Sequence, residues 1–309
     1  MERRDFLRSA AIAGGIAGRG AAAKGPLPRR RYKDNVELSI IGFGGIVVVG
    51  QEQKDADREV AQSVERGVNY FDVAPTYGRG EAETKLGPAL EPHRKGVFLA
   101  CKTTERTAEG ARKELEQSLQ RLRTDHFDLY QFHAVTTTKD VETILGPGGA
   151  AETFLKAREQ GKVKYLGASA HSIEAAIAMM DRFPLDSILF PVNYVCYAQS
   201  NFGPQVVEHA KKKGIARLAL KAMARNRLER GAERKYPKAW YEPFDDREQA
   251  AKALRFTLSE DITAAVPPGD ERLYRLALDL AMEFKPLSAR ERRELLASSA
   301  GIKPLFPVG

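Results

Sequence analysis

Residues 97–133 read VFLACKTTERTAEGARKELEQSLQRLRTDHFDLYQFH, and this stretch decides the fold. It begins with a short apolar run at 97–102 and ends with another at 127–133. Between them, 107–122 has apolar residues at the spacing of an amphipathic helix. Two short strands joined by one helix predict a parallel strand pair with a right-handed crossover.

The same alternation runs from Val36 towards the C-terminus. We expect strands at Leu38–Gly42, Asn69–Val73, Val97–Lys102, Phe127–His133, Lys164–Ser169, Ser187–Asn193, Ile215–Leu220 and Ala264–Pro267. Helical patterns follow them at 56–67, 81–90, 107–122, 150–160, 173–182, 203–213, 246–259 and 270–283. Eight strand-plus-helix units in about 250 residues predict an α/β fold of the (β/α)8 TIM barrel type, as a single domain.

An open, doubly wound sheet is the structural alternative. That fold needs a Gly-x-Gly-x-x-Gly turn leading from its first strand into a helix. Here Gly42-Phe43-Gly44-Gly45 leads into Ile46-Val47-Val48-Val49, where no helix begins. The fingerprint therefore fails, and the closed barrel is the prediction for residues 36–309.

Composition excludes several classes of protein. The chain has 309 residues, 43% hydrophobic and 29% charged, so it is not a disordered chain. Its two cysteines, Cys101 and Cys196, exclude a disulfide scaffold, an iron–sulfur cluster and a four-cysteine zinc site. The formal net charge is +8, but many basic residues stand beside acids, as in Glu291-Arg292-Arg293-Glu294. We therefore expect solvated helix faces and no nucleic-acid partner.

The first 23 residues have the pattern of a targeting signal. Arg3-Arg4-Asp5-Phe6-Leu7 resembles a twin-arginine export signal, and a short Ala- and Gly-rich run follows it. Ala21-Ala22-Ala23 is a small-residue cleavage site, and 24–35 is expected to be a linker. The alternative is a basic tail that happens to contain two arginines. The signal predicts the twin-arginine export machinery as a partner, a periplasmic or otherwise exported location, and no stable membrane insertion after cleavage.

Two segments fall outside the eight units. Residues 222–245 form a long loop after the seventh strand, with Trp240, Tyr241 and six basic residues. Long loops of this kind are usually functional, and we expect a lid over the bound cofactor and substrate. Ser288–Ala297 is expected to be an extra C-terminal helix, capped by Ser288 and Glu291.

Four polar residues stand at the ends of three consecutive predicted strands. They are Asp72, Tyr77, Lys102 and His133, and the C-terminal strand ends carry the active site of such barrels. A neighbouring ammonium lowers the pKa of a tyrosine from about 10, and Asp72 would keep Lys102 charged. His133 would orient a carbonyl oxygen while Tyr77 acts as general acid during hydride transfer. Taken together they predict carbonyl reduction without a metal.

This constellation resembles the aldo/keto reductase family over nearly the whole chain after the signal. The resemblance rests on Asp72-x-Ala74-x-x-Tyr77-Gly78, on Lys102, on Asp128-Leu129-x-x-x-His133 and on the segment Gly161–Ser169. It implies a barrel that binds a nicotinamide cofactor, NADP with NAD as the alternative, across its strand ends. The implied reaction is reduction of an aldehyde or ketone, a small-molecule carbonyl substrate, to an alcohol.

The resemblance also implies cofactor contacts. Ser169 matches the serine that contacts the nicotinamide carboxamide, and Asn193 and Lys221 end the sixth and seventh strands. After the eighth strand, Gly269 and Arg272 stand where the family holds the cofactor phosphates, with Arg272 or Arg275 as the 2′-phosphate ligand of NADP. Asp270 and Glu271 oppose phosphate there, which leaves NAD open.

Two other functions remain to be distinguished from reduction. One is a nucleotide-binding sensor or partner subunit of the same family with little turnover. The other is an unrelated barrel hydrolase that uses Asp72 and His133, although the sequence offers it no second paired carboxylate or metal cluster. Cofactor binding and turnover on an aromatic aldehyde separate the three.

Overall fold

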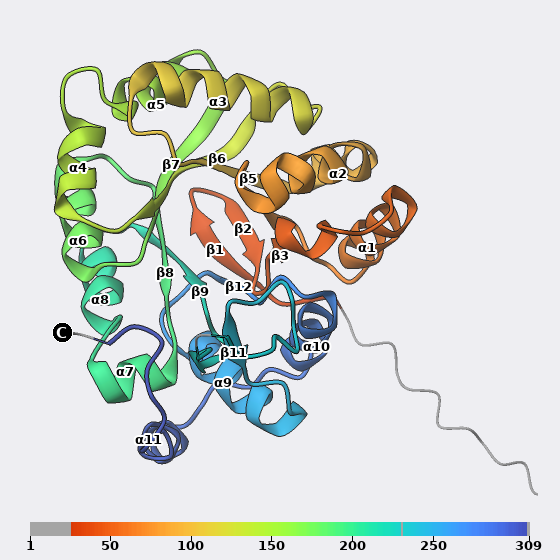
Figure 1. Cartoon of the computed structure of the whole chain (residues 1–309), viewed down its shortest axis with the longest axis vertical. Helices are drawn as coiled ribbons and strands as arrows, with labels where there is room; N and C mark the ends of the chain where they lie inside the picture. Colours follow the sequence, from red (N-terminus) through yellow and green to blue (C-terminus); the bar gives the residue numbers. More distant parts are fainter. Residues whose placement is uncertain (1–25, 230, 308–309) are drawn as a thin grey trace, which may run out of the picture.

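The computed structural model describes residues 26–229 and 231–307, so the expected export signal lies outside the described residues. Eight parallel strands form one sheet in the order β12-β9-β8-β7-β6-β5-β4-β3. A parallel bridge between Ile41 and Ala265 joins the two ends of this sheet and closes the predicted barrel (Figure 1). The strands are β3 (Phe43–Gly44), β4 (Tyr70–Asp72), β5 (Phe98–Thr103), β6 (Phe127–Val135), β7 (Val163–Ala170), β8 (Ser187–Pro191), β9 (Ala216–Leu220) and β12 (Ala264–Val266).

Helices surround the barrel on the outside (Figure 1). They are α1 (Gln53–Glu65), α2 (Glu81–Leu90), α3 (Ala108–Arg121), α4 (Thr138–Leu145), α5 (Ala150–Glu159), α6 (Ile173–Arg182), α7 (Tyr194–Ser200), α8 (Pro204–Lys212), α9 (Arg247–Ser259), α10 (Glu271–Ala281) and α11 (Ala289–Ala297). Short 3-10 helices lie at η1 (Gly45–Val48), η2 (Tyr77–Gly80) and η3 (Glu91–Gly96). The predicted C-terminal helix α11 is confirmed, with the Ser288 and Glu291 capping box at its start.

The first predicted strand, Leu38–Gly42, is correct only in its second half, where Ile41 and Gly42 pair with Ala265 of β12 in the barrel. Its first half belongs to β2 (Val36–Ser39), which pairs with β1 (Arg29–Lys33) in an antiparallel hairpin. Part of the expected linker at 24–35 is therefore strand β1. Tyr32 and Leu38 of this hairpin pack with residues at the starts of the barrel strands, such as Tyr70 and Phe98. The apolar residues of β2 thus close the N-terminal end of the barrel, which leaves the other end for polar chemistry.

The segment 222–245 is not a structureless loop. It contains a second antiparallel hairpin, β10 (Ala224–Arg227) with β11 (Tyr241–Pro243). Tyr236, Tyr241 and Phe244 are buried within the main core, so this segment is anchored on the barrel by packing. Helices α4 and α7 were also not predicted.

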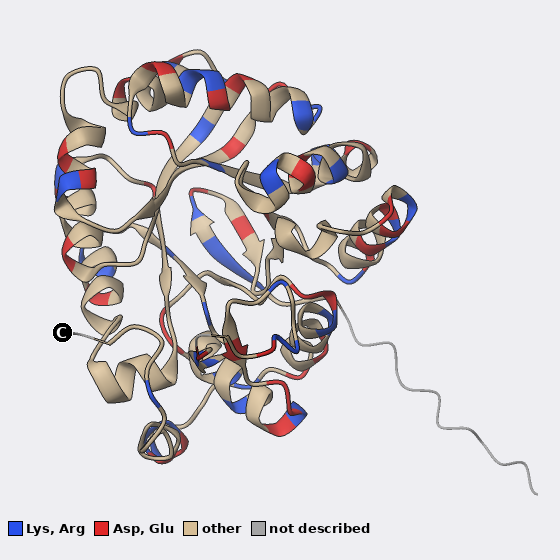
Figure 2. Cartoon of the chain, viewed as in Figure 1, with Lys and Arg blue, Asp and Glu red and all other residues tan. Residues whose placement is uncertain are grey.

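Charged residues are interspersed on the outer helices, and Figure 2 shows Lys and Arg beside Asp and Glu along them. Several are paired one helical turn apart, as in Glu109 with Lys113 and Glu248 with Lys252. Within the described part of the chain, the helices all fall short of the length and apolar character that a bilayer crossing requires.

Candidate active site

The four predicted catalytic side chains come from three neighbouring strands and the turn after the first of them. Asp72 ends β4, Lys102 lies in β5 and His133 lies in β6. Tyr77 begins η2, where Gly78 has a left-handed φ of 60° that turns the chain sharply. Because the strands are parallel neighbours, their C-terminal ends meet at one rim of the barrel.

Lys102 stands between Asp72 and Tyr77. Its ammonium forms an ion pair with Asp72 Oδ1 and donates to the Tyr77 hydroxyl at 3.3 Å and to the Val73 carbonyl at 3.3 Å. The side chains of Lys102 and Asp72 are 0% and 2% exposed, so the pair is removed from water. Buried charges of this kind require such compensation.

Burial and charge set the protonation states of Lys102 and Tyr77. Burial by itself would lower the pKa of the Lys102 ammonium, but the Asp72 carboxylate and the Tyr77 hydroxyl together outweigh it and raise this pKa above its ordinary value. Burial raises the pKa of Tyr77, and the Lys102 ammonium opposes that shift only in part. The expected net lowering of the tyrosine pKa is therefore wrong for this structure, because desolvation outweighs the ammonium. At neutral pH the site holds a protonated phenol beside a charged lysine.

His133 lies edge-on to Tyr77, with ring centroids 5.7 Å apart. Its pKa is well below the ordinary range because the ring is buried, and because Lys102 and other cations add positive charge nearby. The imidazole is thus neutral at physiological pH and has one N–H to donate. Within the described residues, its buried Nδ1 has no hydrogen-bond partner.

Two residues that the sequence analysis missed complete the environment of Asp72. The Tyr70 hydroxyl donates to Asp72 Oδ2 at 3.1 Å, and Gln131 Nε2 donates to the same oxygen at 3.0 Å. Gln131 is a buried amide within the apolar strand β6, and this unusual placement was the signal in the sequence. Together they fix the carboxylate that holds Lys102.

The residues expected to contact the nicotinamide differ in whether their side chains are already bonded within the fold. Ser169 is buried at the end of β7. The Asn193 side chain is fully engaged within the fold, since Oδ1 accepts from the N–H groups of Val195 and Cys196. Its Nδ2 donates to the carbonyls of Lys221 at 2.9 Å and Ala224 at 2.6 Å. In this structure Asn193 caps α7 and holds the chain after β9.

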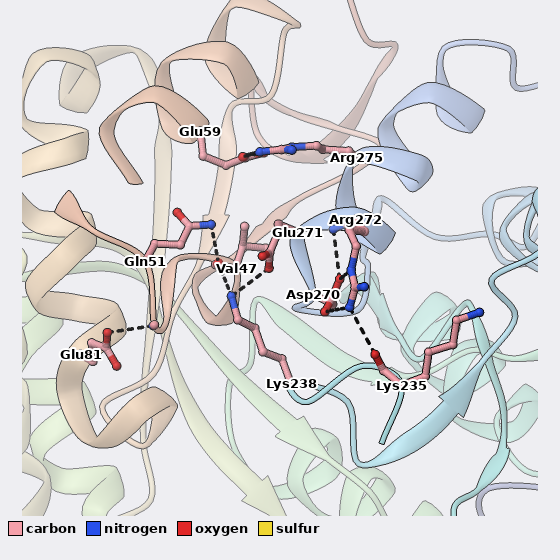
Figure 3. Close-up of polar contacts among 11 residues, drawn as sticks. Val47, Gln51, Glu59, Glu81, Lys235, Lys238, Asp270, Glu271, Arg272 and Arg275 are labelled. Carbon is pink, nitrogen blue, oxygen red and sulfur yellow. Dashed lines mark hydrogen bonds and ion pairs between the residues drawn. The ribbon is translucent and has the colours of Figure 1, made fainter. Parts of the chain in front are cut away.

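The N-terminus of α10 is surrounded by paired charges (Figure 3). Arg272 bonds to Asp270, the N-cap of α10, at 3.0 Å, and Arg275 bonds to Glu59 at 3.1 Å. Gly269 lies so close to Ile46 that an added Cβ would be 2.5 Å from its side chain. Both arginines that were candidates for a cofactor phosphate thus bind carboxylates of the protein here.

The expected lid is tied to this region by Lys238. The Lys238 ammonium donates to the Val47 carbonyl of η1 at 2.8 Å and to Glu271 of α10 at 2.9 Å (Figure 3). The segment after β9 therefore joins two elements that are far apart in sequence. Among the described residues, no group of three or more His, Cys, Asp or Glu is arranged to hold a metal ion.

Comparison with known proteins agrees with this geometry. The profile of the aldo/keto reductase family matches residues 41–292. The aldo-keto reductase YhdN of Bacillus subtilis is 30% identical over 210 residues, covering 62% of this chain and 61% of its own. L-galactose dehydrogenase of Arabidopsis thaliana is 24% identical over 272 residues, covering 82% and 79%.

Among solved structures, aldo-keto reductase AKR11C1 from Bacillus halodurans in its holo form superposes with a TM-score of 0.69 at 22% identity. The superposition covers 91% of this chain and 98% of that one. The curated matches are partial, since YhdN and the uncharacterized oxidoreductase YqkF of Bacillus subtilis are matched over 61% and 48% of their lengths. Because the family profile extends over more than half of the chain and over all eight barrel strands, the chain belongs to the aldo/keto reductase family.

Proposed function

We propose that this protein is an NAD(P)-dependent oxidoreductase that reduces an aldehyde or ketone to an alcohol, with Tyr77 as the general acid. The observation that carries the proposal is the buried ammonium of Lys102, held by Asp72 and 3.3 Å from the Tyr77 hydroxyl. Family membership supports the same reaction class, as does the similarity to relatives such as the methylglyoxal reductase YeaE of Escherichia coli.

Each side chain has one part in the reaction. When bound, the nicotinamide supplies a hydride to the carbonyl carbon. Tyr77 donates its proton to the carbonyl oxygen, and Lys102 stabilises the negative charge that develops on the phenol oxygen. The neutral His133 donates its N–H to the carbonyl oxygen and orients it. Asp72 keeps Lys102 charged and in place.

The residues at the rim fit a nicotinamide dinucleotide. The buried Nδ1 of His133, which has no hydrogen-bond partner among the described residues, supports a bound group at this rim. Ser169 would hold the carboxamide, and the N-terminus of α10 beside Gly269 would hold a phosphate. Lys238 would then hold the segment 222–245 over the cofactor, since its ammonium already bonds to Val47 on one side and to Glu271 on the other.

We take NADP as the cofactor, with Arg272 as ligand of the 2′-phosphate. Arg272 is exposed in its ion pair with the buried Asp270, and that carboxylate keeps the hydrogen bond from the Arg272 backbone N–H when the guanidinium turns to a phosphate. NAD remains the competing cofactor, because Asp270 and Glu271 repel an added phosphate. Fluorescence titration with NADPH and NADH decides between them through the ratio of their dissociation constants.

The test of the proposed function is the Tyr77→Phe variant assayed with benzaldehyde. We expect kcat to fall by about 100- to 10,000-fold, because the proton donor is removed, while cofactor affinity stays the same. Tyr165→Phe is the matched control, since Tyr165 packs at the opposite end of the barrel and is expected to keep full activity. Near-normal turnover by Tyr77→Phe would show that the assignment is wrong. Cofactor binding without turnover in the wild type would instead identify a sensor.

For its location, we propose export by the twin-arginine machinery. The support is the pattern Arg3-Arg4-x-Phe6-Leu7 followed by a short Ala- and Gly-rich run and Ala21-Ala22-Ala23. This pathway carries folded proteins, which would let the enzyme bind its cofactor before it leaves the cytoplasm.

A further inference from the structure

Lys221 is a cation at the catalytic rim that has no anionic partner among the described residues. It directly follows β9, and in the described part of the chain its ammonium has neither a carboxylate partner nor a hydrogen bond. The rings of Trp240 and Tyr241 flank it instead, with centroids 5.0 Å and 4.8 Å from Nζ. Aromatic faces stabilise a cation but leave its hydrogen-bond donors unused.

The backbone of Lys221 is held in a conformation that lysine rarely adopts. Its φ is +67°, in the left-handed region. The Lys221 carbonyl accepts from Asn193 Nδ2 at 2.9 Å and from the Ala224 N–H at 3.0 Å. Backbone strain persists only where the surroundings impose it, and such positions gather at functional sites. The fold thus fixes the direction in which this side chain leaves the rim.

The ammonium shares its surroundings with the carbonyl-orienting histidine. Burial lowers the pKa values of His133 and His171, and the charge of Lys221 lowers both further. The ring of Phe306, from the C-terminal segment, lies 5.7 Å from His171 and 6.4 Å from Trp240. The rings of Trp240, Tyr241 and Phe306 therefore form an aromatic wall next to Lys221, at the same end of the barrel as His133.

Nearby carboxylates of the hairpin are already paired elsewhere. Glu242 bonds to Arg225 at 2.8 Å, and Asp245 accepts from Tyr236 at 2.9 Å and pairs with Lys235. Neither is available to Lys221 without breaking another contact. A partly buried cation left in this way is costly unless a ligand supplies the opposite charge.

We infer that Lys221 binds a carboxylate of the substrate, so that the enzyme prefers oxo acids, carbonyl compounds that carry a carboxylate, over neutral aldehydes and ketones. This inference rests on the proposed function and adds a substrate class to it. The carboxylate takes the unused donors of Lys221 in a charge-assisted hydrogen bond. The apolar part of the substrate packs against Trp240 and Phe306, and its carbonyl reaches His133 and Tyr77. Lys221 is thereby assigned to the substrate instead of the cofactor, where the family resemblance had placed it.

The first test measures binding alone. Trp240 is the only tryptophan of the chain and flanks Lys221, so its emission reports an anion bound there. Benzoate should change the emission saturably, benzamide should not, and Lys221→Met should remove the response to benzoate. Lys164→Met is the matched control, because Lys164 also lies over an aromatic ring, that of Tyr165, but near the start of β7, away from the rim. Equal benzoate binding by Lys221→Met and wild type would overturn the inference.

The second test compares 4-carboxybenzaldehyde with its methyl ester, in which a methyl group removes the negative charge of the carboxylate. Wild type should prefer the acid in kcat/KM, and Lys221→Met should lower the acid-to-ester ratio about 10- to 100-fold, mainly through KM for the acid. Lys221→Arg should restore part of the ratio, and thermal melting checks that each variant is folded. A lower NADPH affinity with an unchanged ratio would assign Lys221 to the cofactor and overturn the inference.

The two proposals fail in different ways. If the protein reduces no carbonyl compound but still binds benzoate through Lys221, the proposed reductase function fails and the anion site stands. If it reduces both test substrates equally in wild type and Lys221→Met, the function stands and the substrate class is wrong.

Benzoate binding also has a defined pH dependence. Burial lowers the pKa of Lys221 to about 8, so the ammonium is charged below that pH and affinity is lost above it. The neighbouring groups do not titrate there, since the pKa of His171 is lowered to about 4, that of His133 is also lowered, and that of Tyr241 is raised. Affinity unchanged up to pH 10 would contradict an ammonium ligand.

Discussion

Replacing Lys102 by methionine tests how much the buried ion pair between Lys102 and Asp72 contributes to stability. The side chain fits the same space but removes the ammonium, and Asp72 is left as an unpaired buried carboxylate with only Tyr70 and Gln131 as donors. Removing one partner of a buried ion pair costs about 3–5 kcal/mol, so Lys102→Met should lose that much free energy of unfolding in urea titrations. Lys113→Met, in an exposed helical pair with Glu109, should lose nothing measurable.

The double variant Asp72→Asn with Lys102→Met separates stability from chemistry. It removes both charges and keeps an acceptor for Tyr70 and Gln131, so it should recover most of the lost stability. It should not recover activity, because Tyr77 still lacks the cation that stabilises its phenolate. We expect kcat to fall at least about 100-fold in both variants. A loss below about 1 kcal/mol in Lys102→Met, or a double variant with wild-type turnover, would refute the reasoning.

Two further predictions concern the expected lid at 222–245 and the expected export signal. Lys238→Ala removes the bonds to Val47 and Glu271, so the cofactor should dissociate faster in stopped-flow displacement and protease should cut residues 231–238 faster than in wild type. Protease should also cut the wild type more slowly with NADPH than without it. Unchanged rates in both comparisons would show that this segment is no lid. Replacing Arg3 and Arg4 by lysine should keep the protein in the cytoplasm on fractionation, and mature protein outside the cytoplasm would reject twin-arginine export.

The barrel and its catalytic rim were predictable because both follow from periodicity. Strand and helix patterns alternate through the chain, and from the second strand to the eighth each expected strand lies within two residues of an observed one. Parallel strands place their C-terminal ends together, so polar residues at those ends had to meet. Asp72, Lys102 and Tyr77 do so through direct contacts.

What could not be predicted depends on contacts between distant segments. The apolar residues of Val36–Ser39 suit a barrel strand as well as a hairpin, and only packing against Tyr70 and Phe98 decides between them. Asn193 ends a strand in the sequence pattern, and its role as the cap of α7 follows from where the chain turns next. The support that Gln131 gives to Asp72 crosses from β6 to β4, a relation that no local spacing reveals.

Lys102 and Lys221 lie at the same rim, but their surroundings give them different roles. Lys102 is fully buried against Asp72, and that carboxylate raises its pKa despite the burial. Lys221 is flanked by aromatic rings, no carboxylate of the described residues pairs with it, and burial lowers its pKa to about 8. A lysine whose charge is already balanced by the protein can stabilise a neighbouring phenol without attracting a ligand to itself. A lysine that has only aromatic faces around it keeps its hydrogen-bond donors for an anion that arrives. The two cations of the rim therefore have different tasks: Lys102 supports the chemistry at Tyr77, and Lys221 recognises the substrate at the aromatic wall.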